Sequence, residues 1–101
     1  MRNEIVFAGT VVKCDVLRHT PAGIPSVKFS LSQESKQAIK LNNATVQIPV
    51  NVELEIIALD QLAQQMVEIQ AGAQVTVKGF LNRKHQKSSV NILHATQIKF
   101  S

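Results

Sequence analysis

This 101-residue sequence contains few aromatic residues and almost no cysteine. It contains four phenylalanines, no tryptophan and no tyrosine, and its only cysteine is Cys14. A single cysteine excludes a disulfide within the chain and a zinc site built from several thiolates, and it is typical of a reducing compartment. With so few rings, we do not expect a surface that holds its ligand mainly by aromatic stacking.

Long hydrophobic runs are also missing. No stretch approaches the roughly 20 apolar residues that a membrane-spanning helix needs, and the first residues lack the apolar core of a secretion signal. We therefore expect a cytoplasmic protein that does not enter a membrane. The length predicts one domain over residues 1–101, with little material to enclose a deep catalytic cavity.

Acidic residues are absent from residue 71 onward, whereas residues 38–70 have a net charge of −3. The last third of the chain therefore holds +5, more than the net +4 of the whole sequence. Its basic residues are Lys78, Arg83, Lys84, Lys87 and Lys99. Such a local excess indicates an anion-binding surface. A solvated face that only keeps the protein soluble is the alternative.

Alternation of apolar and polar residues with a period of two dominates the chain and predicts strands. The clearest case is residues 45–54, where every second residue is aliphatic, which predicts a half-buried strand. Pro49 cannot donate a ladder hydrogen bond, so an edge, a bulge or the end of pairing is expected near it. Residues 27–32 and 75–82 alternate in the same way, and Phe80 falls among the polar positions of the second segment.

The first and last segments alternate less cleanly. Residues 5–13 are apolar on both faces and contain Gly9, which predicts a strand that bends and is covered on both sides. In residues 90–100, His94 falls in phase with aliphatic residues. Either a bulge shifts the register there or the histidine is partly buried.

One helix and one tight turn complete the predicted elements. Leu59, Leu62, Ala63 and Met66 recur at helical spacing and predict a helix of two to three turns within residues 55–68, with Asp60 near its start as a cap or first-turn charge. Residues 20–23 have proline second and glycine fourth, which favours a type I turn. The resulting order predicts an all-β fold, a five-stranded OB-fold Greek-key barrel with one short helix between strands 3 and 4. An SH3-like barrel is the competing interpretation.

Catalysis is the weaker functional hypothesis. The histidines at 19, 85 and 94 are scattered, and no nucleophile, base or carboxylate stands at a spacing that builds an active site or a metal site. No glycine-rich loop joins a strand to a helix, so a nucleotide-binding loop is not indicated. We expect no enzyme activity, no metal and no cofactor.

Binding of single-stranded nucleic acid fits the pattern better. OB folds bind strands across their second and third strands, between the first hairpin loop and the loop that joins strands 4 and 5. Basic residues fall at or beside these places, and one aromatic residue lies with them: Arg18, Lys28, Lys78, Phe80, Arg83, Lys84 and Lys87. We expect phosphate contacts to dominate and Phe80 to stack on a base, unless that ring belongs to the core.

Four pieces of the sequence resemble one known family. They are the Gly9-Thr10-Val11 stretch, the Pro21-Ala22-Gly23-Ile24-Pro25 turn, the Val77-Lys78-Gly79-Phe80 stretch, and the ending Leu93-His94-Ala95 with Gln97-Ile98. In order and in length this sequence is similar to the PriB family of primosomal replication proteins, relatives of bacterial single-stranded DNA-binding proteins.

This resemblance implies an OB-fold homodimer that pairs through strand 1, binds single-stranded DNA, and acts with the PriA helicase and DnaT at stalled replication forks. It places His85 with Lys84 and Lys87 in the basic loop of the family. Thr45 stands where better-known members have a stacking tryptophan, and Glu34 where they have a basic residue. We therefore expect weaker DNA binding. A protein-interaction OB fold that docks a helicase, with weak or no DNA binding, is the alternative function.

Overall fold

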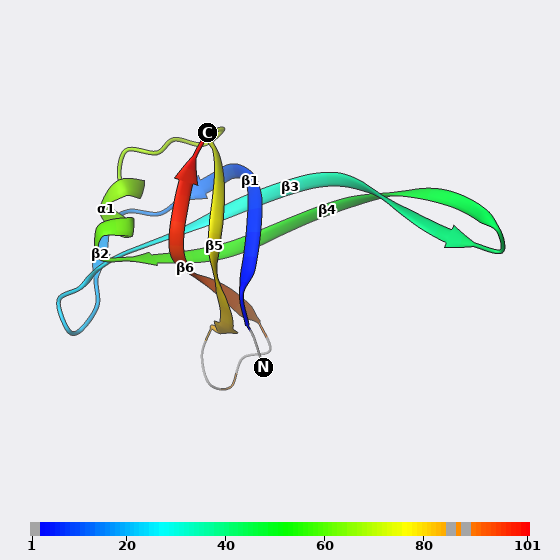
Figure 1. Ribbon diagram of the computed structural model, residues 1–101. Coiled ribbons are helices and arrows are strands. Elements are labelled where there is room, and N and C mark those ends of the chain that lie inside the picture. Colours follow the sequence, from blue (N-terminus) through cyan, green and yellow to red (C-terminus); the bar gives the residue numbers. More distant parts are fainter. Residues whose placement is uncertain (1–2, 85–86, 88–89) are drawn as a thin grey trace.

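Six strands and one short helix make up the part of the chain that the computed structural model describes, residues 3–84, 87 and 90–101 (Figure 1). In chain order they are β1 (Ile5–Cys14), β2 (Arg18–His19), β3 (Pro25–Leu41), β4 (Ala44–Leu59), α1 (Gln61–Met66), β5 (Gln74–Arg83) and β6 (Asn91–Phe100). The sequence pattern does not predict β2, a two-residue strand that pairs with the start of β3. The other five strands and the helix follow the predicted order.

The five long strands close into a barrel. The sheet runs β1-β5-β6-β4-β3, and β1 also pairs with β3, which completes the circle. Neighbouring strands are antiparallel except β4 and β6, which pair in parallel at two positions. Inside the barrel lie aliphatic residues from every long strand together with Phe29, and Ala63 and Met66 of α1 pack against them. The described chain buries no polar or charged side chain, so apolar contact holds the barrel together.

The helix is shorter than predicted, because β4 continues to Leu59 and α1 spans only Gln61–Met66. Ile56 and Ala58 are both buried two residues apart, as in a strand, and they pair with Phe29 and Val27 of β3. The prediction over residues 55–68 was wrong there, because a short apolar run fits either period until its pairing partner is known. Asp60 separates the two elements with a positive φ of 58°, and its side chain makes no capping hydrogen bond.

A long two-stranded ribbon projects from the barrel between the segments 27–32 and 45–54 that were predicted as strands. Both strands are longer than predicted, because β3 and β4 pair without a break from Ser26 with Leu59 to Leu41 with Ala44. Asn42 and Asn43 close the ribbon with φ values of 47° and 66°, the conformation that a two-residue type I′ hairpin turn requires. We call residues 33–52 the arm (Figure 1).

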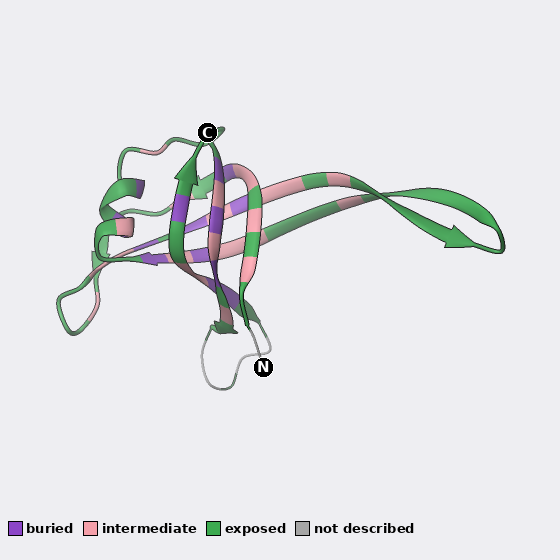
Figure 2. Ribbon diagram, in the orientation of Figure 1, coloured by how far each residue is buried: buried purple, intermediate pink, exposed green. Residues whose placement is uncertain are grey.

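The arm changes the environment of the strand predicted to be half-buried. Val46, Ile48 and Val52 are exposed because no part of the described chain covers them (Figure 2). Pro49 pairs with Lys36 inside the ribbon, while β4 meets β6 only at Ile56 and Ile57. The proline therefore occupies an open edge, which was one of the expected alternatives.

β1 bends as predicted, since it changes partner along its length. Residues from Ile5 to Thr10 pair with β5, and those from Thr10 to Cys14 pair with β3. At Gly9 a Cβ would lie 2.7 Å from the carbonyl oxygen of Ser32, so the close approach of the two backbones requires glycine. The prediction that both faces of this strand are covered was wrong for a single copy of the chain, because Val6 is 63% exposed.

Both alternatives offered for the last strand hold. The register of β5 against β6 shifts at Lys78 and Gly79, and His94 is half-buried. The turn at residues 20–23 is also confirmed, since the Gly23 amide donates to the Thr20 carbonyl at 2.8 Å.

Candidate nucleic-acid interface

One row of side chains crosses four strands on the outside of the barrel. Phe80 pairs with His94, His94 with Ile57, and Ile57 with Lys28, so the register carries the row from β5 over β6 and β4 to β3. Directly paired residues point to the same face of a sheet. The residues beside them in sequence, Phe29, Ile56 and Leu93, are buried, so this outer row faces solvent.

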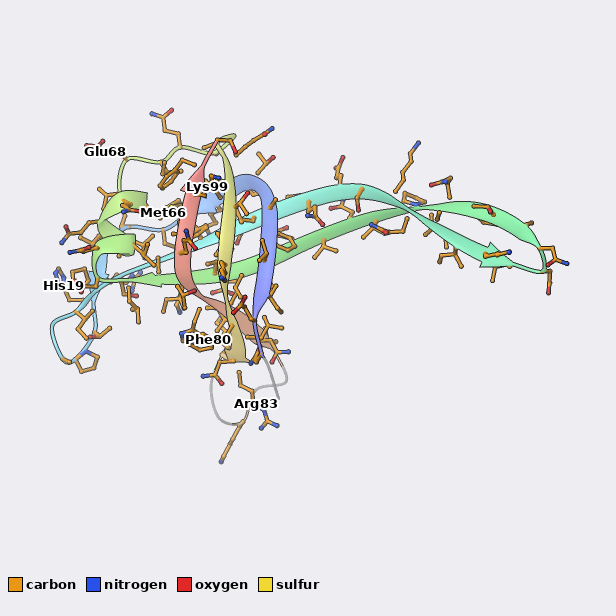
Figure 3. The ribbon with its side chains drawn as sticks, in the orientation of Figure 1. His19, Met66, Glu68, Phe80, Arg83 and Lys99 are labelled. Atoms are coloured by element: carbon orange, nitrogen blue, oxygen red, sulfur yellow. The ribbon has the colours of Figure 1, made fainter. Side chains whose placement is uncertain are left out.

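An aromatic pair forms one end of the outer row. The rings of Phe80 and His94 are stacked with their centroids 5.0 Å apart and their planes within 6°. Phe80 is 40% exposed, so part of its ring is accessible to a ligand (Figure 3). Gly79 makes this pair possible: a Cβ there would collide with the His94 carbonyl, so only glycine lets β5 and β6 approach so closely. The sequence pointed to Phe80 as a binding residue but not to His94. The only unusual feature of His94 in the sequence is that it alternates in step with the aliphatic residues of its strand.

Basic side chains converge at the other end of the row. Lys13, Lys28 and Lys84 line a cavity of about 250 Å³ together with Asp15 and Glu55. A second cavity of about 230 Å³ adjoins it through Lys28 and Asp15 and is lined by Arg18. We call the side chains of Lys13, Arg18, Lys28 and Lys84 the basic groove. Lys13 was missed in the sequence because it lies within an apolar strand.

The groove contains its own counter-charge. Lys84 Nζ lies 3.2 Å from Glu55 Oε2, and both side chains are partly exposed. The backbone of Lys84 donates to the Val90 carbonyl at 2.9 Å, which closes the base of the loop between β5 and β6. Glu55 therefore fastens this loop to β4 and neutralises one of the basic charges.

The remaining predicted contact residues lie outside the groove. Lys78 is held 3.5 Å from Glu4 on the side of the barrel formed by β1, β5 and β6. Arg83 is exposed at the end of β5 (Figure 3), and Lys87 is exposed in the loop beyond it. His85 lies outside the described residues. The structure thus brings together Arg18, Lys28 and Lys84 and leaves Lys78 apart from them.

Two features of the described residues bear on chemistry, namely groups of metal-ligating side chains and the Cys14 thiol. No group of three or more His, Cys, Asp or Glu side chains that could hold a metal ion occurs among them. Burial raises the pKa of the Cys14 thiol, and the charge of Asp15 adds to the rise, so the thiol is a poor nucleophile at neutral pH. Within the same residues, no helix is long and apolar enough to span a membrane.

Thr45 and Glu34, the two positions that differ from the pattern of the resembled family, both lie on the arm. Thr45 pairs with Lys40 near its tip, and Glu34 pairs with Asn51 at its base. Lys36 and Lys40 share the polar face with them, so this face carries opposite charges and no aromatic ring.

Known proteins of similar sequence cover almost the whole chain. A family model described as another single-strand binding protein family matches residues 3–97. The replication restart protein PriB of Nitrosomonas europaea is 32% identical over 93 residues, which cover 92% of this chain and 82% of that protein. The PriB of Yersinia enterocolitica is 34% identical over 101 residues, covering 97% and 92% of the two chains.

Solved structures agree with the sequence relatives. PriB from Ralstonia solanacearum superposes with a TM-score of 0.82 at 26% identity, covering 99% of this chain and 98% of that one. A small single-stranded DNA-binding protein from Streptomyces coelicolor superposes with a TM-score of 0.75 at 25% identity, covering 100% and 95%. These are OB-fold chains, so the predicted OB-fold barrel is confirmed.

Proposed function

Because the chain belongs to this family of single-strand binding proteins, together with the PriB replication restart proteins, we propose that it binds single-stranded DNA without sequence specificity and acts in the restart of stalled replication forks. The observation that carries the proposal is the outer row, which runs from an exposed aromatic pair to the basic groove. The site is built for binding, with no catalytic step.

The geometry supports a strand of DNA that runs across the barrel. Neighbouring strands lie about 4.8 Å apart, so the row from Phe80 to Lys28 spans about 14 Å. A base stacks on the open face of Phe80, and phosphates approach Lys28, Arg18 and Lys13. Arg83 and Lys87 extend the positive field into the loop, and His85 lies between them in the sequence as a further proposed contact. Most of the affinity then comes from phosphate neutralisation and counterion release.

Lys78 and the arm lysines contribute less in this proposal. Lys78 is already paired with Glu4, and Glu34 on the polar face of the arm opposes an approaching phosphate. Since the arm also lacks an aromatic residue, we infer weaker binding than in relatives that stack bases there.

The proposed assembly is a cytoplasmic homodimer of a one-domain chain, which links the PriA helicase and DnaT on forked DNA. Residues 5–9 of β1 pair with β5 on one side and with no described strand on the other, and this unpaired edge supports the dimer. Gln33 donates from its side-chain amide to the Ala8 carbonyl at 2.8 Å, which shows that this carbonyl points away from β5. An antiparallel copy of the same strand would complete such an edge.

One observation favours the alternative, an OB fold that docks an acidic surface of a helicase with weak or no DNA binding. Glu55 and Asp15 line the same cavity as Lys13, Lys28 and Lys84, so its net charge is small. A cavity of small net charge attracts a phosphate backbone only weakly, which favours docking of a protein over binding of DNA.

A fluorescence titration of labelled oligo-dT at several salt concentrations tests the proposed function. We expect saturable binding at low salt that weakens steeply as salt rises, with much weaker binding of a duplex of the same length. Equal binding of single strands and duplex, or no binding of either at low salt, would reject DNA binding and leave the protein-docking alternative.

Neutralising the acid in the groove is expected to strengthen binding. In Glu55→Gln, Lys84 becomes available to a phosphate and a repulsive charge is removed, so affinity for oligo-dT should rise about three- to tenfold at low salt. Glu53→Gln is the matched control, since Glu53 lies two residues away on the same face of β4 but does not line the cavity. An equal gain in both variants would mean that only the net charge matters.

A further inference from the structure

Asn3 lies just before β1 and bonds to the backbone of a distant strand. Its side-chain Nδ2 donates to the Leu81 carbonyl at 2.7 Å, and the Leu81 backbone amide donates to Asn3 Oδ1 at 3.1 Å. The ladder of β1 with β5 has its first pair at Ile5 and Gly79, and the same register continued by two residues places Asn3 opposite Leu81. The Asn3 side chain therefore takes the place that the backbone of a further strand residue would take.

A short carboxamide is the side chain that suits this place. It has an acceptor and donors on one planar group, as a peptide group does, whereas a carboxylate can only accept and an aliphatic side chain can do neither. Because Leu81 offers one donor and one acceptor, each atom of the Asn3 amide meets the backbone group that it requires. We call this pair of hydrogen bonds the Asn3 clamp.

The Asn3 clamp holds β5 directly after Phe80. The N–H and C=O of one strand residue point to the same side, so Leu81 directs both groups away from β6. Phe80 thus lies between two residues that are held from the β1 side, Gly79 by its pairing with Ile5 and Leu81 by Asn3. Figure 1 shows the start of β1 beside the end of β5, where this contact is made.

On the β6 side, the support for Phe80 is irregular. The register of β5 against β6 shifts at Lys78 and Gly79, immediately before the ring. The ring stacks on His94 with one face and is 40% exposed. Its direction is therefore set largely by its own backbone, and the Asn3 clamp restrains that backbone from the side opposite β6.

We propose that Asn3 is a positioning residue of the DNA interface, which acts through Phe80 on the base that stacks there. The inference rests on the proposed function. A ring that is already held in place loses less conformational freedom when a base stacks on it, so the clamp strengthens binding. The phosphate contacts of the loop are independent of the clamp, because Lys84 is fastened by its backbone to the Val90 carbonyl and by its side chain to Glu55.

A double-mutant cycle of Asn3 and Phe80, measured by titration of labelled oligo-dT, tests the proposal. Asn3→Ala should lower affinity about three- to fivefold, in line with the modest net effect of a hydrogen bond, and should leave the salt slope unchanged. In a Phe80→Ala background the same substitution should change affinity by less than about twofold, because the group through which Asn3 acts is gone. An equal loss in both backgrounds, or a lowered salt slope, would overturn the proposal.

Ile98→Val is the matched control for stability. Ile98 belongs to the barrel core and pairs with Val77, so its truncation should lower the unfolding temperature but leave affinity for oligo-dT within about twofold of the wild type. Hydrogen exchange of the Leu81 amide, followed by NMR, reports on the Asn3 clamp itself. It should become faster in Asn3→Ala and stay unchanged in Ile98→Val, since an amide at a strand edge exchanges by local opening.

The outcomes separate the positioning role from the proposed function. Unchanged affinity of Asn3→Ala, or unchanged exchange of the Leu81 amide, would overturn the positioning role while leaving DNA binding in place. Equal losses of affinity in Asn3→Ala and Ile98→Val would also overturn it, because stability alone would then explain the effect. A wild type that binds no oligo-dT would overturn the proposed function and the positioning role with it.

Discussion

Replacing Arg83, Lys84 and Lys87 together by alanine is expected to weaken binding of oligo-dT by more than an order of magnitude at low salt. Each phosphate contact to a single strand contributes about 0.7 to the slope of log K against log salt, so loss of the contacts of Arg83 and Lys87 lowers the slope by about 1.4. Lys84 has an added effect, because its removal leaves Glu55 in the groove without its cation. Fluorescence titrations over a salt series measure the affinity and the slope together.

A charge-matched variant shows whether the position of these residues matters. Gln70→Glu with Lys99→Glu lowers the net charge by the same three units. In Figure 3, Lys99 lies at the end of the barrel opposite Arg83. The control should lose much less affinity and keep most of the salt slope. A slope unchanged by the triple alanine substitution would contradict the proposal that the β5–β6 loop faces DNA.

The strands were predictable where alternation coincides with burial in the barrel. Val27, Phe29 and Leu31, and likewise Val75 and Val77, alternate in the sequence and are buried as expected. Apolar and polar residues also alternate on the arm, but its apolar residues are not buried. Alternation indicates a strand and does not say whether another part of the protein covers its apolar face. The sequence signal that defines the arm is Asn42-Asn43, since asparagine readily adopts the positive φ of a tight hairpin turn.

The candidate site was predictable only in part. Arg18, Lys28 and Lys84 were selected by their places in an expected OB fold, and the structure brings them together. Lys13 and Glu55 enter the same cavity through pairing of β1, β3 and β4, which no local pattern reveals. The stack of Phe80 on His94 likewise depends on the shift in register between β5 and β6. Contacts set by register between distant strands were not accessible from one sequence.

Phe80→Ala is expected to reduce affinity for single-stranded DNA about 5- to 150-fold, since stacking of a base on an aromatic ring contributes about 1–3 kcal/mol. The loss should change little with salt, because no phosphate contact is removed, and this distinguishes Phe80 from the loop residues. Phe100→Ala is the matched control: its ring is 41% exposed, nearly the same as that of Phe80, but it lies at the far end of β6. Titration with oligo-dT and thermal unfolding of the same samples separate binding from stability. Normal affinity with a lowered unfolding temperature would show that Phe80 supports the His94 contact and does not meet DNA.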